Sequence, residues 1–571
     1  MVFPNNFLNL KFDSYFLLLR QYDIFIKHLY IMNNAIFTFN RPANEPVSNY
    51  AEGTVERKML LEELDRQSKM QIEIPLIIGG KEVRTGQMGK VVMPHKHGHV
   101  LATYHKAGTA EVNMAVEAAL KAHDAWMNLS WVDRASIFLR AAELLAGKYR
   151  YVINAATMLG QSKNMMQAEI DSACEAIDFL RFNVFYASQI YSEQPASDHT
   201  VINRLEYRPL EGFVYAISPF NFTAIAANLN AAPALMGNVT VWKPATTAIL
   251  SNFYLMKIFQ EAGLPDGVIN FLPGQGSVIS DVVMNHKALA GIHFTGSNAT
   301  FNGLWRTIGV NLEKYTSYPK IVGETGGKDF IFAHASSRIP ELATAIVRGS
   351  FEYQGQKCSA ASRAYIPRSI WPILKETILG MMARVKMGDV CDSKNLMGAV
   401  IDEKSFDTIM GYIEKAKSSP EAEIICGGVG DKSQGYFIQP TIIITTDPRF
   451  ITMEEELFGP VMTMYIYDDE RFEETLQLCD QTSPYALTGA IFSTNREATT
   501  VAFNALRYAA GNFYINDKPT GAVVGQQPFG GSRGSGTNDK AGGSQNLMRW
   551  VSPRTIKETL CPPTDFPYPY M

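Results

Sequence analysis

Three residues of this 571-residue chain have side chains suited to covalent catalysis, and each lies in a distinctive short motif. Cys358 ends the run 354–358 (QGQKC), Glu324 lies in 323–328 (GETGGK) directly after a short apolar strand, and Asn221 is flanked by two phenylalanines. A thiolate is a strong nucleophile near neutral pH, a carboxylate can activate water, and a side-chain amide can stabilise an oxyanion. Together these groups could form and hydrolyse a thioacyl intermediate.

A cysteine considered alone is more often a small buried apolar residue than a nucleophile. The six cysteines stand at positions 174, 358, 391, 426, 479 and 561, with no C-x-x-C pair among them. A disulfide framework would be unusual in a chain of this length, so we expect a reducing compartment. The surrounding motif singles out Cys358 from the other five.

The composition narrows the class of protein. Apolar residues make up 46% of the chain and charged residues 19%, with a net charge of −4, which is typical of an ordinary globular protein. The chain has no basic excess for nucleic acid phosphates and no polybasic patch for a membrane surface. We therefore expect a small-molecule substrate, and a chain this long must form more than one compact core.

The first residues differ from the rest of the chain. Residues 1–31 are rich in Phe, Leu, Tyr and Ile, but charges interrupt every apolar run before it reaches the roughly 20 residues of a membrane span. They show no secretory cleavage pattern, and Met32 could be the true start. We treat residues 1–40 as an N-terminal extension and expect a cytoplasmic location, or the mitochondrial matrix if residues 1–31 are a transit peptide.

Alternating helices and short apolar strands must position the reactive residues. Helices are expected at 109–126, 133–148, 224–236 and 251–262, and strands at 212–218, 238–243, 268–272 and 290–295. Strands joined by crossover helices imply a parallel sheet covered on both faces, and a second α/β stretch runs from about 324 to 521. Ligands of such sheets bind at the carboxyl ends of the strands.

Two weaker motifs carry little information. The run 273–276 (PGQG) lacks the third glycine of a dinucleotide fingerprint. The run 95–99 (HKHGH) could suggest a metal site, but no acidic or cysteine partner accompanies it. We interpret it as a polar surface loop and expect no metal.

A larger set of motifs, in order along the chain, resembles the aldehyde dehydrogenase superfamily. The set consists of 218–222 (SPFNF), 242–245 (WKPA), 294–297 (FTGS), 323–328 (GETGGK), 354–358 (QGQKC) and 455–460 (EELFGP). The resemblance extends from about residue 43 to the C-terminus and includes the 34-residue spacing from Glu324 to Cys358. It implies an α/β fold with a Rossmann-type cofactor domain, an α/β catalytic domain and a β-hairpin oligomerisation arm.

The resemblance also implies a domain organisation. Residues 41–187 and 211–323 would form the NAD-binding domain and residues 324–533 the catalytic domain. The polar, alternating segment 188–210 is expected to form a protruding hairpin, and with 534–571 it would bridge subunits. We expect a homodimer or a higher homo-oligomer.

For the chemistry, the resemblance implies that Cys358 attacks an aldehyde carbon and that Glu324 is the general base for hydrolysis. The Asn221 amide and the Cys358 N–H would stabilise the alkoxide. The expected cofactor is NAD, with contacts from Ser218, Lys243, Gly296, Ser297, Thr300, Glu456 and Phe458. Phe301 departs from the family pattern, since many members carry Gly there, and this could alter how the cofactor is seated.

Further motifs resemble one subgroup, the Δ1-pyrroline-5-carboxylate dehydrogenases. They are 43–47 (ANEPV), 168–171 (AEID), 181–183 (RFN), 357–360 (KCSA), 511–517 (GNFYIND) and 525–531 (GQQPFGG). The subgroup oxidises glutamate γ-semialdehyde to glutamate, the second step of proline catabolism. The expected substrate contacts are Ser359, Gly521, Ala522, Phe529 and Phe222, with Ala522 standing where several relatives carry Ser.

Two other hypotheses for the function remain at this point. The chain could oxidise another semialdehyde, such as succinate semialdehyde. It could instead be a catalytically silent structural relative, although such a relative would be expected to lose Cys358, Glu324 or Asn221, and all three are present. The bifunctional proline-utilisation proteins are longer, so we expect a separate proline dehydrogenase to supply the substrate.

Overall fold

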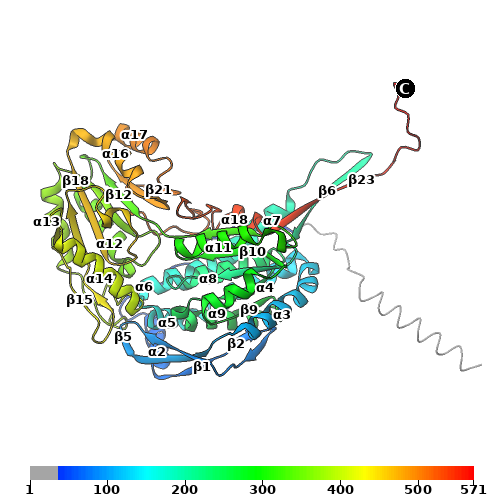
Figure 1. Cartoon of the computed structure of the whole chain (residues 1–571), viewed down its shortest axis with the longest axis horizontal. Helices are drawn as coiled ribbons and strands as arrows, with labels where there is room; N and C mark the ends of the chain where they lie inside the picture. Colours follow the sequence, from blue (N-terminus) through cyan, green and yellow to red (C-terminus); the bar gives the residue numbers. More distant parts are fainter. Residues whose placement is uncertain (1–36) are drawn as a thin grey trace, which may run out of the picture. The chain divides into compact units, whose positions relative to one another are not determined.

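The apolar strands predicted between residues 212 and 295 lie at the centre of one seven-stranded sheet, in a computed structural model that describes residues 37–571 (Figure 1). The strand order is β11-β10-β7-β8-β9-β2-β3. The strands are β2 (Leu76–Ile78), β3 (Lys81–Val83), β7 (Phe213–Ile217), β8 (Val239–Lys243), β9 (Ile269–Phe271), β10 (Leu289–Thr295) and β11 (Lys320–Glu324). From β11 to β9 the pairing is parallel, whereas β2 and β3 add antiparallel at the edge.

The central strands are nearly continuous apolar runs because helices cover both faces of a parallel sheet. Residues 213–216 of β7, for example, are all inaccessible to solvent. The associated helices are α3 (Thr109–Asn128), α4 (Trp131–Ala146), α8 (Thr223–Leu235), α9 (Ile249–Glu261), α10 (Gly276–Met284) and α11 (Asn298–Val310). The predicted helices and strands of this region are confirmed to within about three residues at each end.

The strand order changes direction beside β7. The chain proceeds from β7 to β8 and β9 on one side, then returns to β10 on the other side and continues to β11. The carboxyl ends of β7 and β10 therefore flank a switch point, where open α/β sheets bind their ligands.

A second seven-stranded sheet begins at Asp329, five residues after β11 ends at Glu324 and next to the predicted boundary. Its order is β14-β17-β18-β13-β12-β20-β21, with only β14 antiparallel to its neighbour. The strands are β12 (Asp329–Ala333), β13 (Ala361–Pro367), β14 (Ala422–Cys426), β17 (Thr441–Thr445), β18 (Val461–Tyr467), β20 (Thr488–Phe492) and β21 (Asn512–Ile515). Its helices are α12 (Ile339–Phe351), α13 (Trp371–Met382), α14 (Glu403–Ser418), α15 (Ile451–Glu454), α16 (Phe472–Gln481) and α17 (Arg496–Ala505).

Shorter elements complete the two lobes. A small sheet has the order β1-β5-β4, and two further two-stranded ladders pair β15 with β16 and β19 with β22. These strands are β1 (Ile72–Ile74), β4 (Met88–Met93), β5 (Lys96–His105), β15 (Gly430–Asp431), β16 (Phe437–Ile438), β19 (Tyr485–Ala486) and β22 (Ser532–Arg533). The remaining α-helices are α2 (Val55–Lys69), α5 (Arg150–Gln161), α6 (Met165–Ala168), α7 (Glu175–Ser192) and α18 (Ser544–Met548), with a π-helical turn at Glu169–Cys174.

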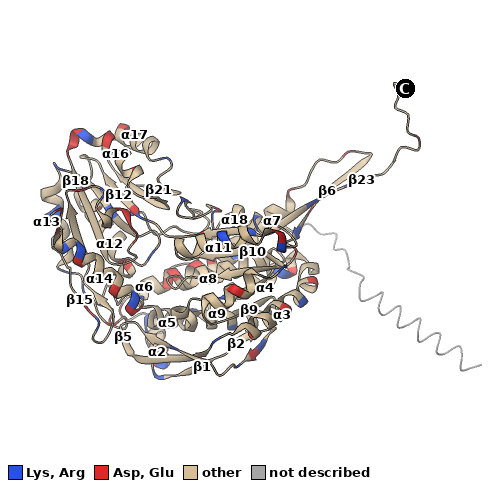
Figure 2. Cartoon of the chain, viewed as in Figure 1, with Lys and Arg blue, Asp and Glu red and all other residues tan. Residues whose placement is uncertain are grey.

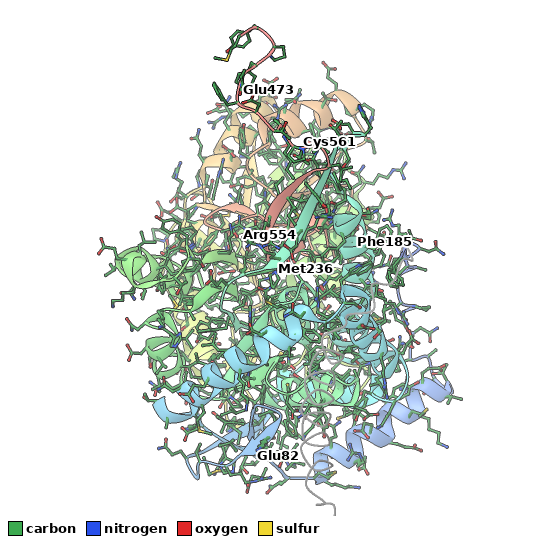
Figure 3. All side chains as sticks on the ribbon, turned by 90° about the vertical axis from the view of Figure 1, so that its right-hand side faces the viewer. Glu82, Phe185, Met236, Glu473, Arg554 and Cys561 are labelled. Atoms are coloured by element: carbon green, nitrogen blue, oxygen red, sulfur yellow. The ribbon has the colours of Figure 1, made fainter. Side chains whose placement is uncertain are left out.

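The projecting arm is a two-stranded antiparallel ribbon, but it is not the local hairpin predicted at 188–210. Helix α7 continues to Ser192, and β6 (Val201–Pro209) pairs along its whole length with β23 (Val551–Thr559) (Figure 1). Figure 3 views this arm with Arg554 and Cys561 labelled, where the exposed segment 560–571 leaves β23. The alternating pattern identified a strand correctly, but its partner lies too far along the chain to be read from local sequence.

The histidine run 95–99 is not simply a surface loop. His95 is buried, and burial lowers the pKa of its imidazole to about 4. His97 stacks on Tyr436 of the second lobe, and His99 bonds the carbonyl of Ser68. The run therefore forms part of a contact between the lobes, which its polar composition concealed.

Two further observations on the described residues concern apolar helices and the distribution of charge. No helix within residues 37–571 is long and apolar enough to cross a bilayer. Figure 2 shows basic and acidic residues interspersed along the ribbon, without a segment of one sign. The predictions made for residues 1–31, including a transit peptide and a start at Met32, lie outside the described residues.

Candidate active site

A cavity of about 320 Å³ lies beside Cys358. It brings together two of the predicted catalytic residues and every predicted substrate contact. They are Cys358, Glu324, Phe222, Ser359, Gly521, Ala522 and Phe529. These residues come from both lobes, so the cavity exists only where the two sheets meet.

The segment before Cys358 is held in an unusual backbone conformation. Tyr353 and Gln354 have φ values of 51° and 54°, a left-handed region that is unfavourable for residues other than glycine. The Gln354 amide donates to the carbonyls of Ser162 and Ala399 at 3.0 and 2.8 Å. These contacts fix the turn that delivers Cys358 to the cavity.

Glu324, at the end of β11, is in direct contact with the nucleophile candidate. The Cys358 thiol donates to Glu324 Oε1 at 3.2 Å. Burial raises the pKa of Glu324 to about 7, against a smaller lowering by this hydrogen bond. Burial and the Glu324 charge together raise the pKa of the Cys358 thiol well above its usual range. The pair therefore rests as a neutral thiol beside a carboxyl group that titrates near neutrality.

Asn221 is buried and contacts the backbone two residues before Cys358. Its Nδ2 donates to the carbonyl of Gln356 at 3.0 Å, within the same segment as Cys358. A side-chain amide nitrogen carries two hydrogens, so one N–H remains for a further acceptor. Asn221 is not part of the cavity lining, although its amide contacts the cysteine segment, and its role toward an oxyanion stays a prediction.

A buried ionic cluster, which sequence reasoning missed, supports the cysteine segment. Lys163 is inaccessible to solvent and forms an ion pair with Asp171, while Lys357 lies 3.5 Å from the same carboxylate. The Lys163 ammonium also lies 4.2 Å from the ring centre of Phe222 and 4.1 Å from that of Tyr353. One buried cation thus joins the loop that follows β7 to the turn that precedes Cys358.

Glu175 is a second residue that sequence reasoning missed. It borders the cavity at the first position of α7, where burial and then the charge of Asp171 raise its pKa well above the usual range. The π-helical turn at Glu169–Cys174 immediately precedes it, and such turns are common at functional sites. No pattern in the sequence indicates a π-helical turn, so the inward direction of Glu175 had no local signal.

The predicted cofactor contacts lie at the carboxyl ends of the first sheet. Ser218 follows β7, Lys243 ends β8 and Gly296 follows β10. Burial lowers the pKa of Lys243, and among residues 37–571 its ammonium has no hydrogen-bond or ion-pair partner. Ser297 caps α11 by accepting a hydrogen bond from the N–H of Thr300 at 3.3 Å. The N-terminus of α11 and the unpaired Lys243 amine, at the ends of the two strands that flank β7, suit an anionic, polar ligand.

Glu456 and Phe458 approach this region from the second lobe. Glu456 Oε1 accepts from the N–H of Gly327 at 2.9 Å, and burial raises the pKa of Glu456 to about 7. A Cβ on Gly326 would lie 1.9 Å from Glu456 Oε2, so a larger residue there would displace the Glu456 carboxylate. Phe458 packs edge-to-face on Phe220, with ring centres 5.7 Å apart. The donors and acceptors available here fit a dinucleotide, with its two riboses and its pyrophosphate.

Phe301, the departure from the glycine fingerprint, packs inward against the sheet. Its ring stacks on Phe294, with centres 5.3 Å apart and an interplanar angle of 19°. It also covers Gly323, where an added Cβ would lie 2.1 Å from a ring carbon. Position 301 carries Phe in place of the fingerprint glycine, and Gly323 on β11 leaves the space that the Phe301 ring fills.

Comparison with known proteins gives consistent relatives. The profile of the aldehyde dehydrogenase family matches residues 82–556. The mitochondrial Δ1-pyrroline-5-carboxylate dehydrogenase of Dictyostelium discoideum is 55% identical over 533 residues, which cover 93% of this chain and 96% of that protein. The mitochondrial Δ1-pyrroline-5-carboxylate dehydrogenase of Homo sapiens is 48% identical over 531 residues, covering 93% and 94%. The crystal structure of the Mycobacterium tuberculosis enzyme bound with NAD is 51% identical, with a TM-score of 0.91 and coverage of 94% and 99%.

The contact between Phe301 and Gly323 generates a stability prediction. Gly323→Ala should lower stability by roughly 1–3 kcal/mol, because the new methyl group overlaps a buried ring that cannot move freely. The measurement is the apparent Tm by scanning fluorimetry. In a Phe301→Ala background the same change should lower the Tm much less, and equal losses in both backgrounds would rule out this contact as the cause.

Proposed function

This chain belongs to the aldehyde dehydrogenase family, and on that premise we propose that it oxidises L-glutamate γ-semialdehyde to L-glutamate with NAD, the second step of proline catabolism. The observation that carries the proposal is the shared cavity, which is lined both by the Cys358 thiol in contact with Glu324 and by polar groups of Ser359 and residues 520–522. The relatives named above support the same reaction.

The far end of the cavity suits a substrate with an α-amino and an α-carboxylate group. Ser359 Oγ donates to Thr520 Oγ1 at 2.8 Å, and the backbone then turns at Gly521, whose φ is +100°. The N–H groups of Gly521 and Ala522 can receive the carboxylate, so Ala522 needs no side-chain hydroxyl there. Phe222 and Phe529 also line the cavity and can flank the aliphatic chain.

The first half of the reaction transfers the aldehyde to the enzyme. Cys358 loses its thiol proton, with Glu324 as the nearest acceptor, and its sulfur bonds to the aldehyde carbon. The carbonyl oxygen becomes an alkoxide, which the Asn221 amide and the Cys358 N–H stabilise. NAD supplies the hydride acceptor. The alkoxide electrons re-form the carbonyl as hydride leaves, and a thioacyl group remains on Cys358.

The second half releases the acid. Once the proton taken from Cys358 has passed to solvent, the Glu324 carboxylate removes a proton from water, whose oxygen adds to the thioacyl carbon. The C–S bond then breaks, and the leaving Cys358 thiolate recovers a proton from Glu324. A base with a pKa of about 7 is well matched to this proton transfer near neutral pH. By raising the pKa of Glu324, burial lets one carboxylate accept a proton first from the thiol and later from water.

The residues present fit NAD at the carboxyl ends of the first sheet. Lys243 and Glu456 would hold the ribose hydroxyls, and Ser218 and Phe458 would flank the nicotinamide side. Gly296, Ser297 and Thr300 would present the N-terminus of α11 to the pyrophosphate. The residues 41–187 and 211–323 would then act as the NAD-binding domain and 324–533 as the catalytic domain.

We also propose a homodimer or higher homo-oligomer in which the arm formed by β6 and β23, together with 534–571, bridges subunits. The arm is a two-stranded ribbon with few buried side chains of its own, which favours packing against another copy. A separate proline dehydrogenase would supply the substrate. Both curated relatives described above are named mitochondrial, which favours the mitochondrial matrix over the cytoplasm.

Replacement of the nucleophile tests the first step. Cys358→Ala should lower NAD-dependent oxidation of the semialdehyde by more than about a thousandfold. The other cysteine that lines the cavity, Cys174, lies beside Glu169, where burial and that carboxylate raise the pKa of its thiol. NAD binding, followed by quenching of intrinsic fluorescence, should stay near normal. Turnover that survives the substitution would remove Cys358 from this role.

Replacement of the base separates the two half-reactions. Glu324→Gln should slow hydrolysis far more than acylation and give a burst of NADH followed by a slow steady state, because solvent can take the thiol proton in place of Glu324 whereas hydrolysis needs a positioned base. In the wild type, steady-state turnover should rise with pH through about 7, as the neutral carboxyl becomes the carboxylate that can accept a proton. Loss of this limb in the variant is the expected result, and an unchanged pH profile would contradict it.

A substrate panel tests the narrower claim. The values of kcat/KM for Δ1-pyrroline-5-carboxylate, in equilibrium with the open semialdehyde, and for succinate semialdehyde should differ by about tenfold or more in favour of the former, because only it uses polar groups for the amino end. A preference for succinate semialdehyde would shift the proposal to another semialdehyde. No NADH formation with any small aldehyde in well-folded protein would support a silent relative.

A further inference from the structure

We propose that the segment 41–47, here termed the strap, positions the loop 520–527 and thereby sets which substrates fit the cavity, with Asn44 as the principal positioning residue. This inference rests on the proposed function, in which Gly521 and Ala522 of that loop receive the substrate carboxylate. The strap precedes every helix and strand of the described chain, and 43–47 was singled out as a motif without a role.

The strap contacts the loop through three hydrogen bonds. Asn44 Nδ2 donates to the carbonyl of Val524 at 2.8 Å, and Gln526 Nε2 donates to Asn44 Oδ1 at 2.8 Å. Arg41 Nη2 donates to the carbonyl of Gly525 at 2.5 Å. Three consecutive residues of the loop are therefore tied to the strap.

The same asparagine is tied to helix α7. Its Nδ2 also donates to Asp178 Oδ2 at 2.8 Å, and the N–H of Glu45 donates to Asp178 Oδ1 at 2.7 Å. Asp178 is 4% exposed; burial raises the pKa of Asp178, while these two donors oppose that rise. Both hydrogens of the Asn44 amide and its oxygen are thus engaged, and no side chain without an amide supplies this combination.

The strap itself is firmly anchored. The Glu45 carboxylate lies between Arg150 and Arg181, with an N–O distance of 2.6 Å to each. Further along, the N–H of Ser48 and the hydroxyl of Tyr50 donate to Glu169 at 2.9 and 2.6 Å. Glu169 belongs to the π-helical turn beside the cavity, so the strap is joined to a wall of the active site.

Apart from the strap, the loop is held at two points. Its start is tied to the cysteine segment, since Ser359 donates to Thr520, and Val524 is buried among apolar side chains. Between these points Gly521 has a φ of +100° and no side chain to pack. At Gly525 the backbone meets Phe182 of α7, where an added Cβ would lie 2.2 Å from the ring. The distance from Cys358 to the N–H groups of Gly521 and Ala522 therefore depends on where the strap holds residues 524–526.

The strap also borders the cavity directly. Asn44, Glu45 and Val47 line it, on the same side as residues 520–524 of the loop. A shift of the strap would consequently change both the length of the cavity and the direction of its carboxylate-binding N–H groups. An aldehyde without a carboxylate makes no contact with these N–H groups, so a shift of the strap should change the kinetics of the semialdehyde but not those of the simple aldehyde.

The decisive variant is Asn44→Ala, with Asn49→Ala as the matched control. Asn49 carries the same side chain five residues away, is exposed, and accepts one hydrogen bond from the N–H of Ala51 within its own turn. Steady-state kinetics are measured with Δ1-pyrroline-5-carboxylate and with propanal. For Asn44→Ala we expect KM for the first substrate to rise about tenfold with kcat within about twofold, as the loss of roughly one positioning contact implies, and propanal kinetics to stay unchanged.

Gln526→Ala provides a second, exposed handle that does not endanger folding. It should raise the same KM by a smaller factor, and the double variant with Asn44→Ala should be less than additive, because both changes break one shared contact. Equal losses with both aldehydes would assign Asn44 to general stability, and an unchanged KM in either variant would overturn the strap's role.

Hydrogen exchange of residues 519–527 tests the strap independently of the substrate. Exchange in this segment should accelerate in Asn44→Ala and Gln526→Ala but not in Asn49→Ala, because loss of the strap contacts frees the loop. If the wild type fails to oxidise the semialdehyde, the proposed function falls, whatever the exchange rates are. If the wild type is active and exchange is unchanged in Asn44→Ala, the strap proposal alone falls.

Discussion

The contact between the Cys358 thiol and the Glu324 carboxyl is the constraint on which the rest of the structure depends. Glu324 ends β11 in the first lobe, and Cys358 lies in the second lobe before β13. Their side chains meet at 3.2 Å where the two lobes join. Burial raises the pKa of both groups, so neither keeps a full charge at rest. The two sheets, the strained turn before the cysteine and the glycines of 323–328 all serve to make this approach possible.

Buried charges around that contact are arranged in pairs rather than left alone. Lys163 and Lys357 share Asp171, and Lys163 adds two aromatic faces from different loops. Isolated ions would be costly in such surroundings, whereas a cluster with satisfied partners holds its neighbours in one geometry. The same logic operates at Glu169, which accepts from Arg150, Tyr50, Asn154 and the backbone of Ser48, and so connects the strap to the π-helical turn.

The sequence allowed most of the first sheet to be predicted, and it singled out Cys358 and Glu324, which the structure brings into contact, because both depend on local signals. Buried parallel strands such as Phe213–Ile217 are apolar runs between turn residues, and Cys358 and Glu324 lie in recognisable motifs. Features that depend on contacts between distant residues were missed or misassigned. Glu175 turns inward because of a π-helical turn, β6 pairs with a strand from the far end of the chain, and Phe301 is accommodated by a glycine on another strand. Each has a clear physical cause, but none has a local signature.

The pairing of β6 with β23 has a consequence for how the chain folds during its synthesis. Pro209 lies opposite Val551, so the ribosome must make the entire second lobe before the ribbon can close. At about 5–20 residues per second, β6 waits many seconds as an unpaired edge. Its alternating charged residues, among them Arg204, Glu206 and Arg208, disfavour pairing of this edge with other strands before β23 is made. Nascent chains thus acquire a finished arm only when the second lobe already exists.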